Sequence, residues 1–265
     1  MWTKVDRLAT SWEEKFSKAA TKALEHDKRE LLALLSEAKH KSLEAKATVD
    51  WQDYLLKAKD YLSNAGDENW RKTFLPVVRG VITAQGESLN ADFGMQFDVR
   101  NLFAEQWFDD YMLKFAQPIN ATTSDDISRL QQTAMEQGWS VPDMQKALGS
   151  LFDQYLTGGG LTDEERQWFQ DRTPAYRTEN IARSETMRAS NTGSTALYRG
   201  WGVGQKEWLA TKDNRVRPEH LAANGQVVGI EETFDVGGEQ LEYPGDPNGD
   251  PANTCQCRCT VLPVM

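Results

Sequence analysis

The chain has 265 residues, of which 39% are hydrophobic and 26% are charged, as is typical of a soluble globular protein with one large domain or two smaller ones. Its net charge of −10 and sequence pI near 4.9 argue against a broad nucleic-acid-binding surface. No apolar run is long enough to span a membrane, and the N-terminus lacks the apolar core of a signal peptide, so we expect a cytoplasmic protein without a membrane partner.

The first predicted element is a long helix over residues 3–47, which contain no Gly or Pro and repeat apolar residues at helical spacing. Residues 1–48 hold ten basic and eight acidic side chains, a mixture typical of a solvated helix face. A weak contact with DNA through this helix is the alternative. A helix of this length is expected to pack on later helices or on another protein.

The next predicted elements are helices over residues 50–63 and 67–85, separated by a break at Asn64-Ala65-Gly66. Pro76 is expected near a helix start or a kink, because proline lacks a backbone N–H. Residues 91–117 are rich in aromatic side chains at helical spacing, which predicts one buried helix face formed by Phe103, Trp107, Phe108, Tyr111 and Phe115.

Residues 118–123 are predicted to form a linker, after which Ser124 caps a helix that ends at Gly138. Ser140 and Asp143 predict a capping box for a further helix that reaches Leu151 or beyond.

Three consecutive glycines, residues 158–160, predict a flexible boundary between the two parts of the chain. Residues 162–165 are predicted to cap a short helix. Thr173-Pro174 is predicted to open a longer one, residues 174–199, with proline at its first position.

Beyond residue 203 the pattern changes to short strands, predicted at 206–210, 226–230 and 257–262, with residues 235–251 as a loop. The predicted fold class is therefore α+β. A mainly helical region, residues 1–157, precedes a small α+β module, residues 161–265, that contains the 174–199 helix.

All three cysteines lie within five residues of one another, as Cys255, Cys257 and Cys259. Zinc binding by Cys257 and Cys259 with His220, joined by Cys255 or Asp213, is one interpretation. In an extended strand same-face side chains lie about 6.6–7 Å apart, so a metal requires a bend in this segment. The alternatives are small, buried apolar side chains of a half-buried strand, which we favour, and a redox role.

A second group of chemically active residues is the segment from Asp213 to His220, in which a turn precedes a short helix started by Pro218. Arg217 and His220 could bind a phosphate-bearing substrate, with His220 as an acid–base group. The interpretation that we favour is a structural network in which Arg217 pairs with Glu185. Its predicted members are Arg183, Glu185, Asp213, Arg215, Arg217 and His220.

The order of these pieces resembles the Mu F-like head-morphogenesis family of tailed phages over about residues 124–265. The resemblance rests on Ala182-Arg183-Ser184-Glu185-Thr186, the Asp213–His220 segment, Tyr243-Pro244-Gly245-Asp246-Pro247 and Cys257-Arg258-Cys259. Because Pro-Gly favours turns, the Tyr243 segment is expected to be an ordered loop anchored by that tyrosine.

The resemblance implies a minor head protein that acts in procapsid assembly and in genome packaging or delivery. The implied partners are the portal protein, the scaffold or the major capsid protein. The implied locations are the host cytoplasm during assembly and then the head interior or portal region of the virion. No phosphate-binding loop or hydrolase motif is present, so the sequence does not require an enzyme. The alternatives are an enzyme that acts on phosphate-bearing substrates and a metal-stabilised binding module, and the chain could be part of a longer protein.

Overall fold

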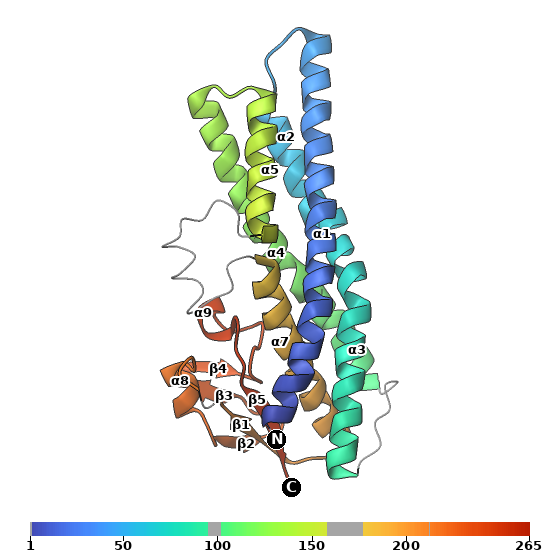
Figure 1. Cartoon of the computed structure of the whole chain (residues 1–265), viewed down its shortest axis with the longest axis vertical. Coiled ribbons are helices and arrows are strands. Elements are labelled where there is room, and N and C mark those ends of the chain that lie inside the picture. Colours follow the sequence, from blue (N-terminus) through green and yellow to red (C-terminus); the bar gives the residue numbers. More distant parts are fainter. Residues whose placement is uncertain (1, 95–101, 158–176, 212) are drawn as a thin grey trace.

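The computed structural model describes residues 2–94, 102–157, 177–211 and 213–265, and side chains are discussed for residues 10–94, 116–157, 177–211 and 213–265. Its fold is the α+β arrangement predicted from the sequence, with a long helical bundle and a small module of short strands beside the lower part of the bundle (Figure 1). In the described part of the chain, no helix is both long and apolar enough to cross a membrane.

The bundle is built from helices whose apolar faces meet in one core. These are α1 (Trp2–Ala45), α2 (Trp51–Tyr61), α3 (Asp67–Phe93), α4 (Leu102–Gln137) and α5 (Val141–Thr157). Phe16, Leu31 and Leu35 of α1 are fully buried in that core, as are Trp70 and Phe74 of α3. The periodicity that predicts the first helix therefore also identifies its packed face.

The predicted break between the second and third helices is wrong, because a π-helical turn, Leu62–Gly66, carries the chain from α2 into α3. Pro76 lies in the interior of α3 and not at a helix start. Residues 118–123 lie inside α4, so they form no linker and Ser124 caps no helix. Local breaking signals are overridden here by contacts between helices.

One such contact joins α4 to the π-helical turn. Asn120 is 3% exposed, and its amide donates to the Leu62 carbonyl at 3.0 Å and to the Asp67 carboxylate at 2.6 Å. The side chain thus stabilises the turn, in which backbone hydrogen bonds depart from the regular α-helical pattern. From its local sequence Asn120 is predicted to lie in a linker, but in the fold it joins two helical segments.

The predicted capping box is confirmed. The backbone N–H of Ser140 donates to the Asp143 carboxylate at 2.9 Å, and the Asp143 N–H lies 3.4 Å from the Ser140 hydroxyl. Gly138 ends α4 with a φ of +65°, which glycine adopts without steric cost. These short-range interactions are contained in the sequence itself, so sequence reasoning finds them.

Helix α7 (Arg177–Gly200) lies between the bundle and the module (Figure 1). Ile181 and Ala189 belong to the bundle core, whereas Leu197 and Tyr198 belong to the core of the module. At Gly193 an added Cβ would lie 2.9 Å from the Ile82 side chain of α3, so glycine permits the close approach of these two helices. Both cores therefore depend on α7.

The module contains two small antiparallel sheets, one of three strands and one of two. Strands β1 (Gln205–Leu209), β2 (Val227–Gly229) and β5 (Thr260–Val264) form the first in the order β2-β1-β5, with Trp208 opposite Val261. Strands β3 (Phe234–Val236) and β4 (Glu239–Leu241) form the second. Short helices α8 (Pro218–Ala222) and α9 (Pro251–Thr254) complete the module.

The predicted strands at 206–210 and 226–230 correspond to β1 and β2, but the third begins at Thr260 and not at Cys257. Residues 235–251, predicted as a loop, include β4 and most of β3. Four predicted features lie outside the residues or side chains described: the aromatic face of residues 103–115, the Gly158–Gly160 boundary, the cap at 162–165 and the Thr173-Pro174 helix start.

Candidate functional site

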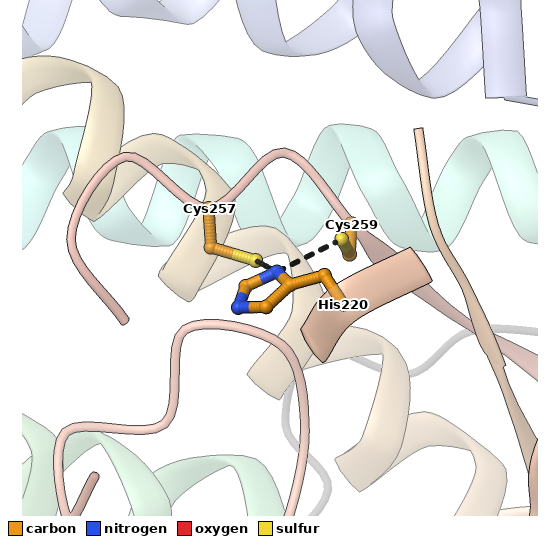
Figure 2. Close-up of side chains that lie close together, drawn as sticks. All are labelled: His220, Cys257 and Cys259. Atoms are coloured by element: carbon orange, nitrogen blue, oxygen red, sulfur yellow. Dashed lines mark hydrogen bonds between the residues drawn. The ribbon is translucent and has the colours of Figure 1, made fainter. Parts of the chain in front are cut away.

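The candidate site is formed by His220, Cys257 and Cys259, which the fold brings together from two separate segments (Figure 2). Each of the three side chains is at most 2% exposed. His220 Nδ1 lies 3.3 Å from Cys259 Sγ and 3.6 Å from Cys257 Sγ. Cys255 is exposed and does not belong to this group of ligand atoms, which lie within 4.8 Å of one another.

The position of His220 follows from local sequence. Pro218 starts α8, as predicted, and its fixed φ suits the first position of a helix. His220 then points into the module, where its ring meets the edge of the Trp208 ring at a centroid distance of 5.6 Å. Its Nε2 lies 2.7 Å from Asn253 Oδ1. Both ring nitrogens are thus within reach of polar partners.

The cysteine segment is bent, and the strand predicted from Cys257 begins only at Thr260. Helix α9 ends at Thr254, and Gln256 has a φ of +55°, which reverses the chain direction locally. The Gln256 N–H donates to the Ser184 hydroxyl of α7 at 2.9 Å and holds the bend in place. This bend turns Cys257 and Cys259 toward His220 and leaves Cys255 outside.

Proximity of the three groups changes their proton affinities. The hydrogen bond from Cys257 lowers the pKa of Cys259 to about 5, an effect opposed by burial and reinforced by His220. The same hydrogen bond, together with burial, raises the pKa of Cys257. Burial by itself lowers the pKa of His220, but its contacts with Cys259 and Asn253 raise that pKa above its ordinary value. The two thiols and the imidazole therefore shift one another's pKa values through direct contact.

A bidentate ion pair lies beside the cluster. The Arg258 guanidinium donates to the two carboxylate oxygens of Asp213 at 2.5 and 2.8 Å, and this contact holds the pKa of Asp213 below its usual range. Asp213 also accepts the Arg215 N–H at 2.9 Å, as in an Asx turn. Arg217 donates to the Cys255 carbonyl at 2.7 Å. These contacts join the turn before α8 to the cysteine segment.

The six residues predicted as one network do not form it as a whole: Asp213 and Arg215 contact each other, but Glu185 and Arg183 bind elsewhere. Glu185, 5% exposed, forms an ion pair of 2.6 Å with Arg188 and not the expected pair with Arg217. Arg183 faces α1, where its Nε lies 3.6 Å from the Glu13 carboxylate. Because Arg188 is one helical turn from Glu185, the pair forms within α7. Arg183 and Glu185 point in different directions, as expected from their spacing.

Sequence reasoning missed Asn191, which is fully buried in α7 and connects it to the module. Its Nδ2 donates to the carbonyls of Pro244 and Cys259 at 3.0 and 2.9 Å. Its Oδ1 accepts from the Thr260 hydroxyl at 2.9 Å and from the Val261 N–H at 3.3 Å. Every hydrogen-bonding group of the amide is therefore used. An asparagine in a polar helix gives no local sign of such a role.

The Tyr243–Pro247 segment is an ordered loop, as predicted, and Tyr243 is 5% exposed. Gly245 has a φ of +84°, and its carbonyl accepts from Arg188 Nε at 2.8 Å. Asp246 organises the loop internally by accepting the N–H groups of Glu242 and Asn248 at 2.8 and 2.9 Å. The loop thus positions carbonyl groups that α7 binds.

Comparison with known proteins assigns the chain to a family. The model of the family described as "Phage Mu protein F like protein" matches residues 125–262, which cover the end of α4, α5, α7 and the module as far as Leu262. The chain belongs to this family, so the resemblance seen in the sequence is confirmed. The class is that of phage head-morphogenesis proteins, which implies association with the virion.

Two curated proteins are similar in sequence to part of this chain. The uncharacterized protein YqbB of Bacillus subtilis (strain 168) is 27% identical over 163 residues, 60% of this chain and 48% of YqbB. NAD(+)--arginine ADP-ribosyltransferase EFV of Enterococcus faecalis (strain ATCC 700802 / V583) is 30% identical over 111 residues, 38% of this chain and 22% of that protein. The matches thus span about half and about a fifth of these relatives. No solved structure matches the chain.

Proposed function

We propose that the chain is a minor head protein of a tailed bacteriophage, which acts in procapsid assembly and in genome packaging or delivery. The family match over residues 125–262 carries this proposal, because it includes α7, which joins the module to the bundle, and the module as far as Leu262 in β5. The proposed partners are the portal protein, the scaffold or the major capsid protein. The proposed locations are the host cytoplasm during assembly and then the head interior or portal region.

The contacts of the site support a structural role for the residues that the family motif contains. His220 is 2% exposed, whereas an acid–base group acting on a phosphate-bearing substrate has to be accessible. Arg217 binds a backbone carbonyl, and Asp213 is engaged by Arg258. The enzymatic name of EFV belongs to a protein of which the match covers 22%, so we carry no transferase activity over to this chain.

The proposal is tested by an in-frame deletion of the gene in the phage that encodes this chain, with complementation in trans. We expect fewer infectious particles from the deletion and recovery on complementation, with the chain present in purified procapsids or virions. Aberrant heads would assign the defect to assembly and empty heads to packaging. Filled heads that fail to infect would assign it to delivery.

A pairwise test identifies the partner. The tagged chain is expressed with the portal, scaffold or major capsid protein, and co-purification followed by chemical cross-linking shows which one it contacts. Binding to none of the three, together with a normal infectious titre in the deletion phage, would refute the proposed function.

A further inference from the structure

The cluster of His220, Cys257 and Cys259 has the chemistry of a metal site, whatever the role of the protein in the phage. His220 Nδ1 and the two sulfur atoms converge from α8 and from the bend after α9 (Figure 2). All three are atoms that bind zinc in proteins. Among the residues that the structure describes, this is the group of potential metal ligands whose members lie within 4.8 Å of one another.

The imidazole is oriented as a metal ligand requires. Asn253 Nδ2 donates to the Val236 carbonyl and to the Glu239 carboxylate, both at 3.1 Å, so the Asn253 oxygen must face His220. That oxygen accepts a hydrogen bond from His220 Nε2–H at 2.7 Å. Nδ1 then faces the two sulfur atoms. A hydrogen bond on the remote nitrogen is the usual partner of a metal-bound histidine, because it fixes the orientation of the ring.

The separations between these atoms match those around a tetrahedral zinc ion. Zn–S bonds of about 2.3 Å and Zn–N bonds of about 2.0–2.1 Å, at tetrahedral angles, place sulfur and nitrogen about 3.6 Å apart. The two sulfur–nitrogen separations here are 3.3 and 3.6 Å. The ligands are thus already close to the arrangement that the metal needs, so little chain movement has to accompany binding.

The charges also fit a divalent metal. Two thiolates balance Zn²⁺, so a zinc complex of Cys257, Cys259 and neutral His220 has no net charge. This matters because all three side chains are buried, and a buried net charge is costly. Cys255 is exposed and lies outside this group of ligand atoms, so the described residues supply three ligands to the site.

We propose that His220 Nδ1, Cys257 Sγ and Cys259 Sγ bind one zinc ion, which fastens α8 to the segment between α9 and β5. Helices α8 and α9 have only five and four residues, so a metal crosslink between these segments would contribute directly to the folding of the module. The side chain of Asn253 acts as a positioning group for the histidine ligand.

The first test measures metal content. Full-length protein is produced in zinc-containing medium, purified with reductant and without chelator, and analysed for zinc, iron, copper and nickel. We expect about one zinc per chain. Cys257→Ser and Cys259→Ser should lose the zinc. The matched control Cys255→Ser changes the same residue type two positions away and should retain it.

Several results would overturn the proposal. Wild-type protein could remain well below one zinc per chain after zinc is added and excess is removed, or it could hold a different metal. Cys255→Ser could lose as much zinc as Cys257→Ser. Absence of metal would leave Cys257 and Cys259 as buried apolar or redox-active side chains. A different metal would exclude zinc, and zinc loss in Cys255→Ser would contradict the assigned set of ligands.

The second test uses wild-type protein alone, so it remains decisive if the serine variants do not fold. Zinc is removed with a chelator and replaced by Co²⁺, and the absorption spectrum is recorded. We expect thiolate-to-cobalt charge-transfer bands and the intense visible bands of tetrahedral cobalt. The melting temperature should fall on metal removal and recover with zinc. A cobalt spectrum without thiolate bands, or a melting temperature unchanged by the metal, would refute the proposal.

Discussion

The bundle and the module are stabilised by different kinds of contact. In the bundle, long helices bury large apolar side chains such as Phe16, Trp70 and Phe74 along continuous faces. In the module, strands of three to five residues are held to α7 by buried polar side chains, above all Asn191, and to α8 by the His–Cys–Cys cluster. The module also has a small apolar core that includes Trp208 and Phe234, but one buried amide, that of Asn191, makes four hydrogen bonds between α7 and the rest of the module.

The largest predicted effect is at Asn191. Asn191→Leu leaves two carbonyls, a hydroxyl and a backbone N–H without their partner in a buried position, and each unsatisfied group costs about 1–3 kcal/mol. We expect the module to lose about 4 kcal/mol or more of stability, measured by urea unfolding monitored by fluorescence. The exposed Asn214→Leu is the matched control and should change stability by less than about 0.5 kcal/mol. Equal effects of the two substitutions would contradict the proposed difference between bundle and module.

The second prediction compares the contributions of Arg188 and Arg217 to stability. Arg188 pairs with the buried Glu185 and also donates to the Gly245 carbonyl, whereas Arg217 is half-buried and donates to one carbonyl. Arg188→Ala is therefore expected to cost about 3 kcal/mol, since it weakens the pairing of a buried carboxylate. Arg217→Ala is expected to cost about 1 kcal/mol, the contribution of one hydrogen bond. Thermal unfolding of both variants tests this order, and a larger loss for Arg217→Ala would reverse the assignment.

The bundle has a polar centre of its own at Asp27. Burial raises the pKa of Asp27 from 3.8 to about 6, although Tyr61 and Trp70 donate to its carboxylate at 2.8 and 2.7 Å. The folded chain therefore binds this proton more tightly than the unfolded chain does. Through this group the unfolding free energy should fall by about 2 kcal/mol as pH rises from about 4 to 6, and stay level above pH 7.

The measurement compares urea unfolding of wild type and Asp27→Asn across that pH range. The stability of the wild type relative to that of Asp27→Asn should fall as pH rises, because only the wild type loses stability through this carboxyl. Asp143 is the contrasting case, since hydrogen bonds from Ser140 lower its pKa and its stabilising contribution is lost as pH falls. A pH-independent difference for Asp27→Asn would show that its pKa is not raised.

The smallest expected effects come from two helix glycines. Gly193→Ala places a Cβ 2.9 Å from Ile82, and such overpacking between α7 and α3 is expected to cost about 1–2 kcal/mol. Gly149→Ala in α5 meets nothing within 4 Å and should stabilise the protein by about 0.5–1 kcal/mol, because alanine favours the helix. Calorimetric melting temperatures that move in opposite directions would confirm the close helix approach.

Sequence alone identified the features that depend on neighbours along the chain. The 3.6-residue period predicts α1 and its buried face, and the Ser140–Asp143 capping box predicts the start of α5. Pro218 predicts the start of α8. The ordered series of short motifs also indicated the family that the comparison confirmed. The local predictions are correct because the groups that interact lie within a few residues of one another in the sequence.

Only the tertiary structure decided which distant groups meet. Residues 118–123 have the composition of a linker, yet the segment is helical. Its Asn120 side chain donates a hydrogen bond to the π-helical turn after α2. The cysteine segment alternates like a strand, but Gln256 bends it and Ser184 of α7 holds the bend. Glu185 was expected to pair across the module and instead pairs with Arg188. In each case the deciding partner is supplied by chain folding, because local sequence leaves more than one pairing of buried polar groups open.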